Sequence, residues 1–271
     1  MYAFTKLFTA LSLLAAVNAF PAADIWGVQR RASTNLTGGS ICPTGGFDIM
    51  GELPANINDN GGEPLPMPNT SAPVYTTLSV GVQNYTCGDN SQWNAQGGLT
   101  YLFDMSCLPQ MHHKPFTSFI AAIWDSAPPT VTNQDFEALV EKVNPGVALG
   151  LHYWITNPVN ASAGINAVWD FSKAERFQND TNKANAFLVA AETGNVPDPT
   201  NPSVNSPWLY EPILYVDGKA DGQLATQVYR FNSNGGAAPN TSCTPGAPTL
   251  QVKSTLNFWL YGGAWENTIQ N

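Results

Sequence analysis

Short runs in which apolar and β-branched residues dominate follow one another along most of the chain, separated by Gly, Pro, Asn and Asp. Runs of this length and composition predict β-strands. The seven predicted strands cover residues 74–87, 98–103, 119–124, 148–155, 207–216, 223–231 and 249–261. Residues 256–260 are apolar at nearly every position, which predicts a strand that is buried on both faces.

Helical spacing of apolar residues is clear in one segment. It runs from Phe136 to Val143, follows a polar cap at Thr132 and stops before Pro145. A second short helix is predicted over 183–191. Many short strands with one or two helices predict an all-β fold, a single-domain sandwich or barrel with helical insertions.

The first nineteen residues have the pattern of a secretory signal peptide, residues 1–19. A positively charged start is followed by an apolar run and by a small-x-small cleavage pattern that ends at Ala19. The apolar run of about eleven residues is shorter than the ~20 that a membrane span needs, and no later stretch is long or apolar enough. We therefore expect no membrane anchor. The dibasic pair Arg30-Arg31 either ends a propeptide over 20–31 or lies solvated in a leader.

Two regions follow the leader: an irregular, Gly-, Pro- and Asn-rich N-terminal arm over 32–72 and a β-rich domain over 73–271. Removing residues 1–19 takes away Lys6 and no acid, so the formal net charge changes from -9 to -10. An acidic chain of this kind argues against nucleic acid or an anionic membrane surface as partner. The sequence does not indicate an oligomeric state.

Six Asn-x-Ser/Thr triplets predict N-glycosylation, which places a protein in the secretory pathway. Their asparagines are Asn35, Asn69, Asn84, Asn160, Asn179 and Asn240. Together with the leader they predict a secreted glycoprotein that is extracellular or held in a cell wall.

The four cysteines, Cys42, Cys87, Cys107 and Cys243, are an even number, so in an oxidising compartment they predict two disulfides. No Cys-x-x-Cys spacing supports zinc. His112 and His113 are adjacent and would point to opposite sides of an extended segment, so we interpret them as part of a solvated surface loop. No metal is expected.

Motifs of nucleotide and acyl chemistry are missing from the sequence. It has no G-x-G-x-x-G, no G-x-x-x-x-G-K-[ST] and no G-x-S-x-G, so we expect no cofactor. His152 lies in a predicted strand between aromatic residues. It is interpreted either as a half-buried histidine that bonds a neighbour or as a general base paired with Asp170. Tyr153, Trp154 and Trp169 are candidates for stacking on a sugar, or are core residues.

Five blocks in a fixed order make residues 80–262 resemble the DUF3455 family, whose secreted members are common in fungi. They are GVQNYTC at 81–87, LGLHY at 149–153, VWDF at 168–171, PWL at 207–209 and the stretch from 222 to Cys243. The chain departs from the family pattern at Asn234, where Thr is usual, and at Ala238, where Pro is common. Residues 109–147 resemble an insertion.

The resemblance implies a β-rich domain without a settled activity. Since Cys87 and Cys243 lie in two of the blocks, it also implies the disulfide Cys87–Cys243, which leaves Cys42–Cys107. Some members are labelled malate dehydrogenase, but this chain has neither a dinucleotide fingerprint nor an alternating βα pattern. Within the last block, residues 232–236 are interpreted as a turn that reverses the strand ending at Phe231.

Three hypotheses of function follow. The first is an extracellular or cell-wall binding protein that holds a wall polysaccharide or a host surface without turnover. The second is an extracellular hydrolase that acts on a polysaccharide or an ester through His152 and Asp170. The third is a structural component of the cell wall.

Overall fold

The computed structural model describes residues 38–59, 61–143 and 145–266. The predicted signal peptide, the dibasic pair and Asn35 lie outside the described residues. In the described part, strands dominate and two α-helices occur, which confirms the all-β prediction. The strands are β1 (Tyr75–Cys87), β2 (Trp93–Asp104), β3 (Ala148–Thr156), β4 (Ile165–Asp170), β5 (Phe187–Ala190), β6 (Gly194–Val196), β7 (Trp208–Pro212), β8 (Tyr215–Val216), β9 (Lys219–Ala220), β10 (Gln227–Gly235) and β11 (Leu250–Tyr261).

The helices are α2 (His113–Ser126) and α3 (Asn133–Val143). Short 3-10 turns complete the described elements: η1 (Ile49–Gly51), η2 (Ile57–Asp59), η3 (Gln110–His112), η4 (Pro145–Val147), η5 (Ala161–Ala163), η6 (Glu175–Phe177) and η7 (Lys183–Asn185). At the start of α3 the Thr132 hydroxyl accepts from the Asp135 amide at 3.2 Å, and the Asp135 carboxylate accepts from the Thr132 amide at 2.8 Å. This reciprocal cap is the one expected at Thr132.

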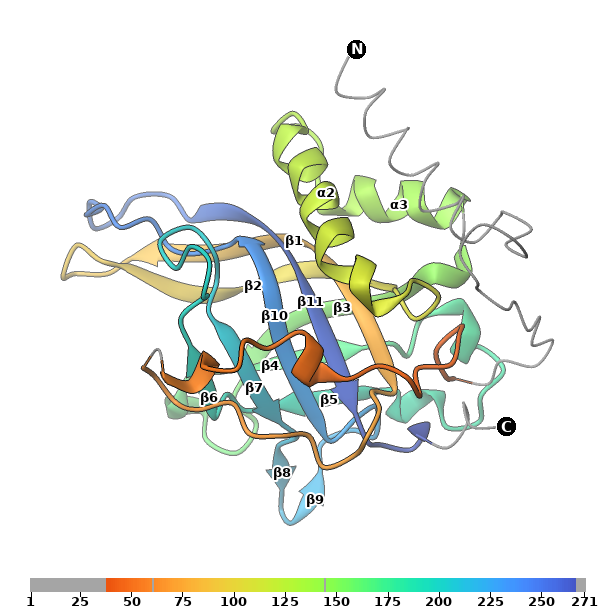
Figure 1. Ribbon diagram of the computed structural model, residues 1–271. Coiled ribbons are helices and arrows are strands. Elements are labelled where there is room, and N and C mark those ends of the chain that lie inside the picture. The colour runs from red at the N-terminus through yellow and green to blue at the C-terminus, as the bar shows by residue number, and fades with distance from the viewer. Residues whose placement is uncertain (1–37, 60, 144, 267–271) are drawn as a thin grey trace.

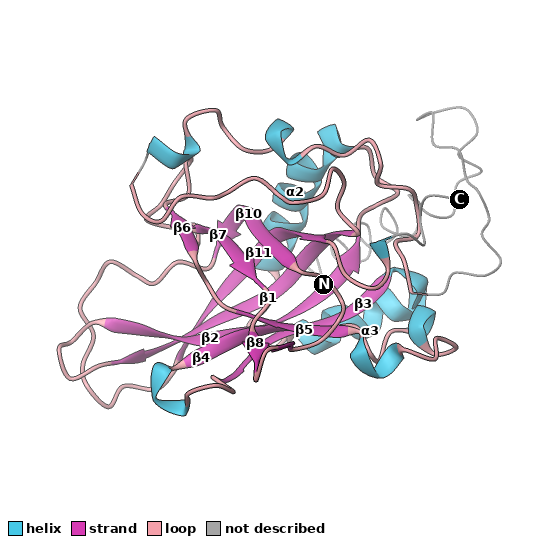
Figure 2. Ribbon diagram, turned by 90° about the horizontal axis from the view of Figure 1, so that it is seen from below, coloured by secondary structure: helices cyan, strands magenta, loops and turns pink. Residues whose placement is uncertain are grey.

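Nine strands form one antiparallel sheet in the order β5-β4-β3-β2-β1-β11-β10-β7-β6, and β8 pairs with β9 in a separate hairpin (Figure 1). The sheet is strongly curved. The rings of His152 on β3 and Phe258 on β11 lie 4.7 Å apart although two strands separate β3 from β11 in the sheet. Side chains can meet in this way only inside a sheet that curls toward a barrel. Figure 2 shows the strands gathered in the middle of the molecule, with the helices toward its edges.

Each face of the curved sheet has its own core. The inner face is filled by residues such as Leu102, Trp169 and Phe258, all nearly inaccessible to solvent. The outer face packs under α2 and α3 through residues such as Val80 and Trp124. Residues 47–59 and 61–65 of the N-terminal arm cover the outer face of β10, β11 and β7 with a third apolar cluster (Figure 1).

Two of the predicted elements are wrong. Residues 119–124, predicted as a strand, belong to α2, because Thr117, Ile120 and Trp124 are buried at helical spacing. Their aromatic and β-branched composition favoured a strand, but packing against the sheet selects the helix. Residues 183–191, predicted as a helix, form η7 and then β5, whose hydrogen bonds to β4 complete the sheet edge.

The predicted turn at 232–236 is also wrong. Residues 227–235 form one continuous strand, β10, and its pairing with β11 shifts register between Phe231 and Asn234. The glycines and asparagines of this stretch therefore serve a β-bulge inside the strand rather than a reversal of the chain.

Both disulfides join segments that are distant in sequence. Cys42 bonds Cys107 and so fixes the arm to the segment after β2, while Cys87 bonds Cys243 and ties the end of β1 to the loop before β11. These are the two pairs that the family blocks implied. They close loops with sequence separations of 65 and 156 residues, and long loops gain most from cross-linking.

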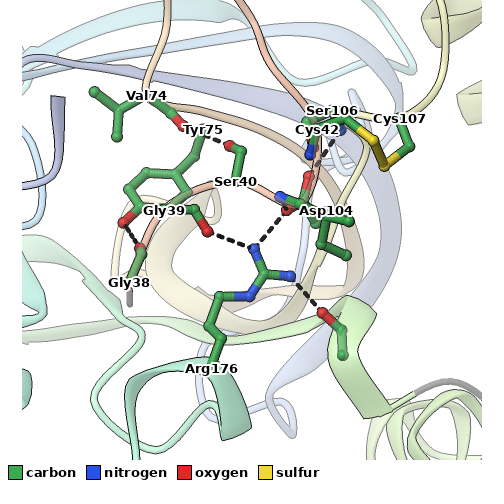
Figure 3. A network of polar contacts seen from close by, with 12 residues as sticks. Gly38, Gly39, Ser40, Cys42, Val74, Tyr75, Asp104, Ser106, Cys107 and Arg176 are labelled. Atoms are coloured by element: carbon green, nitrogen blue, oxygen red, sulfur yellow. Dashed lines mark hydrogen bonds and ion pairs between the residues drawn. A yellow bond between two sulfur atoms is a disulfide. The ribbon is translucent and has the colours of Figure 1, made fainter. Parts of the chain in front are cut away.

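A buried ion pair links the arm to the sheet (Figure 3). The Arg176 guanidinium contacts the Asp104 carboxylate at 2.5 Å, and both side chains are at most 4% exposed. Arg176 also donates to the carbonyls of Gly39 and Gly146. Asp104 accepts from the amides of Ile41 and Ser106 at 2.9 and 2.7 Å. The ion pair and its hydrogen bonds therefore connect four segments of the chain: the arm, the end of β2, the turn η4 and the turn η6.

Replacing Arg176 by Met should lower the free energy of unfolding by about 3–5 kcal/mol, because Asp104 is then left buried without its cation. Asp104→Asn should cost a similar amount, and the double variant should cost clearly less than the sum of the two. Denaturant unfolding of the purified protein measures all three. Lys173→Ala, at an exposed position nearby, is the matched control and should change stability by less than about 0.5 kcal/mol. Single variants that cost under about 1 kcal/mol would contradict this role of the pair.

Candidate functional site

His152 lies inside the curved sheet and is 1% exposed. Its ring stacks on Trp169 with centroids 4.4 Å apart, and it contacts Trp154 at 4.3 Å. Nδ1 is 2.9 Å from the carbonyl oxygen of Val168, so this nitrogen carries the proton and donates. Burial lowers the pKa of His152 to about 3, and the Arg230 charge adds to this effect. His152 is therefore neutral near pH 7 and is packed as a core residue.

The two tryptophans near His152 differ in exposure. Trp169 is fully buried and cannot present its face to a ligand, whereas Trp154 is half-buried at the edge of the inner core. The Trp154 ring packs closely on the backbone of Gly97, where a Cβ would lie 2.6 Å from the ring. Trp154 is therefore held against β2 and has little freedom to rearrange around a sugar.

His152 and Asp170, the proposed catalytic pair, project from opposite faces of the sheet. In the pairing of β3 with β4, His152 lies opposite Trp169 and Leu151 lies opposite Asp170. Neighbouring residues of a strand point to opposite faces, so Asp170 is on the outer face with Tyr153 while His152 is on the inner face. The sequence-based pairing of these two residues is wrong because it overlooked this alternation.

An open pocket of about 660 Å³ lies on the outer face where Asp170 is located. Its volume is within the range of small-molecule sites. Three surfaces form it: the side of α3, the start of β3 and the segment after β4. Its polar lining consists of Glu137, Glu141, Lys142, Asp170, Lys173, Glu175 and Gln178, and its apolar lining of Ala138, Ala148, Gly150, Leu151 and Ala174.

The floor of the pocket depends on a close approach of two strands at Gly150. This residue has φ of 140°, and a Cβ there would lie 2.0 Å from the carbonyl oxygen of Asp170. Any side chain would push β3 away from β4, which explains the glycine in the LGLHY block. The LGLHY and VWDF blocks thus meet beneath the pocket.

Charges of both signs face the pocket, with carboxylates in excess. Partial burial raises the pKa of Glu137, and Glu141, one helical turn further along α3, adds to the rise. Asp170 is held in place by Ser172, whose amide and hydroxyl donate to one carboxylate oxygen at 2.9 and 2.6 Å. Burial and the neighbouring Asp170 charge raise the pKa of Tyr153. Asp170 and Tyr153 are therefore brought together, on the face opposite His152.

Sequence reasoning singled out Asp170 but missed the rest of the pocket. The signal present in the sequence was the charge pattern of residues 137–142, which puts Glu137 and Glu141 on one helix side. The contribution of residues 173–178 could not be found without knowing that this segment packs beside α3.

His113, interpreted as part of a surface loop, is instead buried at the first residue of α2. Its Nε2 donates to the carbonyl oxygen of Leu108 at 2.8 Å.

Within the described ranges, no group of three or more His, Cys, Asp or Glu residues is placed to hold a metal ion. The same residues contain no helix that is long and apolar enough to cross a membrane.

The described sequons lie at the surface. Asn69, Asn160, Asn179 and Asn240 are exposed. Asn84 is half-buried on β1, where its side chain accepts a hydrogen bond from Gln251. These positions leave room for attached sugars, and glycosylation itself stays a prediction.

Comparison with known proteins gives one match. A family model described as protein of unknown function (DUF3455) matches residues 68–262 of the 271-residue chain. No curated protein and no solved structure matches the chain.

The buried state of His152 predicts a pH dependence of stability. In the unfolded chain a histidine has a pKa of ~6.5, so the folded state disfavours the protonated ring between that value and about 3. His152 should therefore contribute stability above pH ~6.5 that is lost as pH falls toward 3, on the order of 4 kcal/mol in total.

Denaturant unfolding of the wild type and of His152→Phe between pH 3 and 7 tests this. The difference in stability between the two proteins should shrink or reverse as pH falls, because Phe does not titrate. Trp169→Phe disturbs the same aromatic stack without removing a titrating group, so it should lower stability by an amount that does not change with pH. Parallel pH profiles for the wild type and His152→Phe would disprove the assignment.

Proposed function

The chain belongs to the DUF3455 family, and from its own geometry we propose that it is a secreted, glycosylated protein that binds a cell-wall polysaccharide without turning it over. The observation that supports this most is the open, mixed-charge pocket between α3 and the segment after β4. The binding residues would be Asp170, Glu141, Lys173 and Gln178.

The lining suits a hydroxylated ligand. Each sugar hydroxyl can donate and accept, so it bonds well to sites that offer carboxylate acceptors beside ammonium and amide donors. The pocket supplies acceptors at Glu141 and Asp170 and a donor at Lys173, above a floor of small apolar residues. The Gln178 amide nitrogen already donates to the carbonyls of Lys173 and Ala174, which leaves its side-chain oxygen as a further acceptor. Small floor residues let a sugar ring lie close to the backbone.

The hydrolase alternative loses its proposed catalytic pair. His152 is buried in the inner core and neutral, and Asp170 is on the opposite face of the sheet. A general base must reach the proton that it takes, directly or through one water. We therefore favour binding over hydrolysis.

The two disulfides support an extracellular location. Disulfides form and persist in oxidising compartments, and the two seen here tie together segments far apart in the chain. The exposed sequons are consistent with passage through the secretory pathway.

Polysaccharide pull-down and a glycan array with the full secreted protein test the binding role. Wild type should be retained by at least one insoluble wall polysaccharide, and Lys173→Ala or Glu141→Gln should weaken retention by roughly tenfold each, the usual cost of losing a charged hydrogen bond. Gln134→Ala, at an exposed position of α3 that does not line the pocket, is the matched control and should bind like wild type.

The same incubations should release no new reducing ends. If the wild type releases reducing ends and the pocket variants do not, the function is hydrolysis rather than binding. Retention that is equal in the pocket variants and in Gln134→Ala would place the binding surface elsewhere. Failure of every polysaccharide to retain the protein would refute the proposed function.

Secretion and modification are tested by intact mass. Expressed with its own leader in a eukaryotic secretory host, the protein should begin at Phe20, or at Ala32 if the dibasic pair is cleaved. Enzymatic removal of N-glycans should reduce the mass in steps of one glycan per occupied sequon. Retention of residues 1–19 in the mature protein, or a mass without glycans, would contradict this part of the proposal.

A further inference from the structure

Asn179, one of the predicted glycosylation sites, directly follows a residue that lines the open pocket. It begins the triplet Asn179-Asp180-Thr181 and is exposed in the turn after η6. Glu175 and Gln178 of the same segment line the pocket. Consecutive Cα atoms are ~3.8 Å apart, so a glycan on Asn179 is attached at the rim of the pocket.

The backbone on both sides of Asn179 is held by hydrogen bonds. The amide of Gln178 donates to the carbonyl oxygen of Glu175 at 3.0 Å. The amide of Asp180 donates to the carbonyl oxygen of Phe177, also at 3.0 Å. The attachment point therefore stays beside the pocket, and the glycan moves only through the Asn179 side chain and its own glycosidic bonds.

The lining of the pocket suits the sugar residues of such a glycan. An N-linked glycan is a chain of hydroxylated rings, and each hydroxyl can donate and accept. The carboxylates of Asp170 and Glu175 are acceptors for these hydroxyls, and the ammonium of Lys173 is a donor. The chemistry that suits an external polysaccharide therefore also suits the glycan of the chain itself.

Covalent attachment makes even a weak contact with the pocket significant. A ligand on a short flexible linker has an effective concentration in the millimolar range. At an effective concentration equal to its dissociation constant, a contact forms half of the time, so a contact with a dissociation constant of ~1 mM is well populated. An external polysaccharide must displace the glycan, and its apparent affinity then falls by about twofold or more.

We propose that the glycan on Asn179 covers the open pocket and competes with external polysaccharide, so that occupancy of this one sequon regulates binding. The inference rests on the proposed function, because it requires N-glycosylation and a pocket that accepts sugars. It adds a difference between two forms of the protein: the form without a glycan on Asn179 binds the polysaccharide more tightly.

The sequon at Asn240 serves as a distant comparison. Asn240 is exposed in the loop that a disulfide ties to Cys87 at the end of β1. Cys87 pairs with Trp93 at the start of β2. Gly150 of the pocket pairs with Leu102, near the other end of β2. Nine residues of strand, ~30 Å, separate the two pairings, so a glycan on Asn240 is attached far from the pocket.

Two variants at one position test the proposal by retention on the polysaccharide. Thr181→Ala removes the sequon and keeps Asn179, while Thr181→Ser keeps an Asn-x-Ser triplet. With all proteins secreted from the same eukaryotic host, Thr181→Ala should bind about twofold or more tightly than wild type. Thr181→Ser, with its glycan in place, and Asn240→Gln should bind like wild type. Peptide mass spectrometry measures the occupancy of Asn179 in each protein.

Acetylation of lysine side chains gives a readout that needs no polysaccharide. Lys173 lines the pocket, whereas Lys114 is exposed on α2 outside it. Lys173 should react more slowly in the glycosylated wild type than in Thr181→Ala, and Lys114 should react equally in both. If no polysaccharide retains any variant but the difference at Lys173 persists, the proposed function fails while the coverage of the pocket by the glycan is upheld.

Three results would overturn the proposal. The first is a secreted protein in which Asn179 carries no glycan. The second is equal affinity of Thr181→Ala and Thr181→Ser for a polysaccharide that retains the wild type. The third is acetylation of Lys173 at the same rate with and without the glycan.

Discussion

The ion pair between Arg176 and Asp104 is the contact on which the arrangement of the chain depends. A lone charge at this depth would be very costly, so neither residue can be buried without the other. Their remaining hydrogen bonds go to backbone groups of Gly39, Ile41, Ser106 and Gly146, which are thereby fixed as well. The Cys42–Cys107 disulfide holds the same junction covalently. The arm is thus an integral layer of the fold, and residues 47–53 can cover β10 and β11 only because this junction holds their start.

The sequence was sufficient to predict the all-β class, six of the strand regions and the capped helix α3, because each depends on a local pattern. Residues 256–260 are buried on both faces as expected, since one face meets the inner core and the other lies under α2 and the arm. Residues 119–124 were misassigned because their side chains suit either element, and only contact with the outer face of the sheet decides for α2.

The candidate site was harder to predict for a geometric reason. His152 and Asp170 lie in adjacent strands, but their side chains point to opposite faces of the sheet. Which residues share a face depends on the strand register, and a shift of one position reverses it. The pairing of β3 with β4 is regular and sets His152 opposite Trp169, one position away from Asp170, and no local pattern in the sequence specifies that register. The pocket also needs α3 and residues 173–178 to lie side by side, a long-range contact that no local pattern encodes.

Titratable groups in the interior oppose one another in their effect on stability. Burial lowers the pKa of His152 and His113 to about 3 and about 4, so both favour the folded state most at neutral pH. Burial raises the pKa of Glu211 to about 7 despite the Arg230 charge, so this carboxyl favours the folded state most below its unfolded value of ~4.3. Stability lost by the histidines on acidification is therefore partly offset at Glu211. A protein built in this way loses less stability across the mildly acidic range than one in which the buried histidines titrate without such a carboxyl.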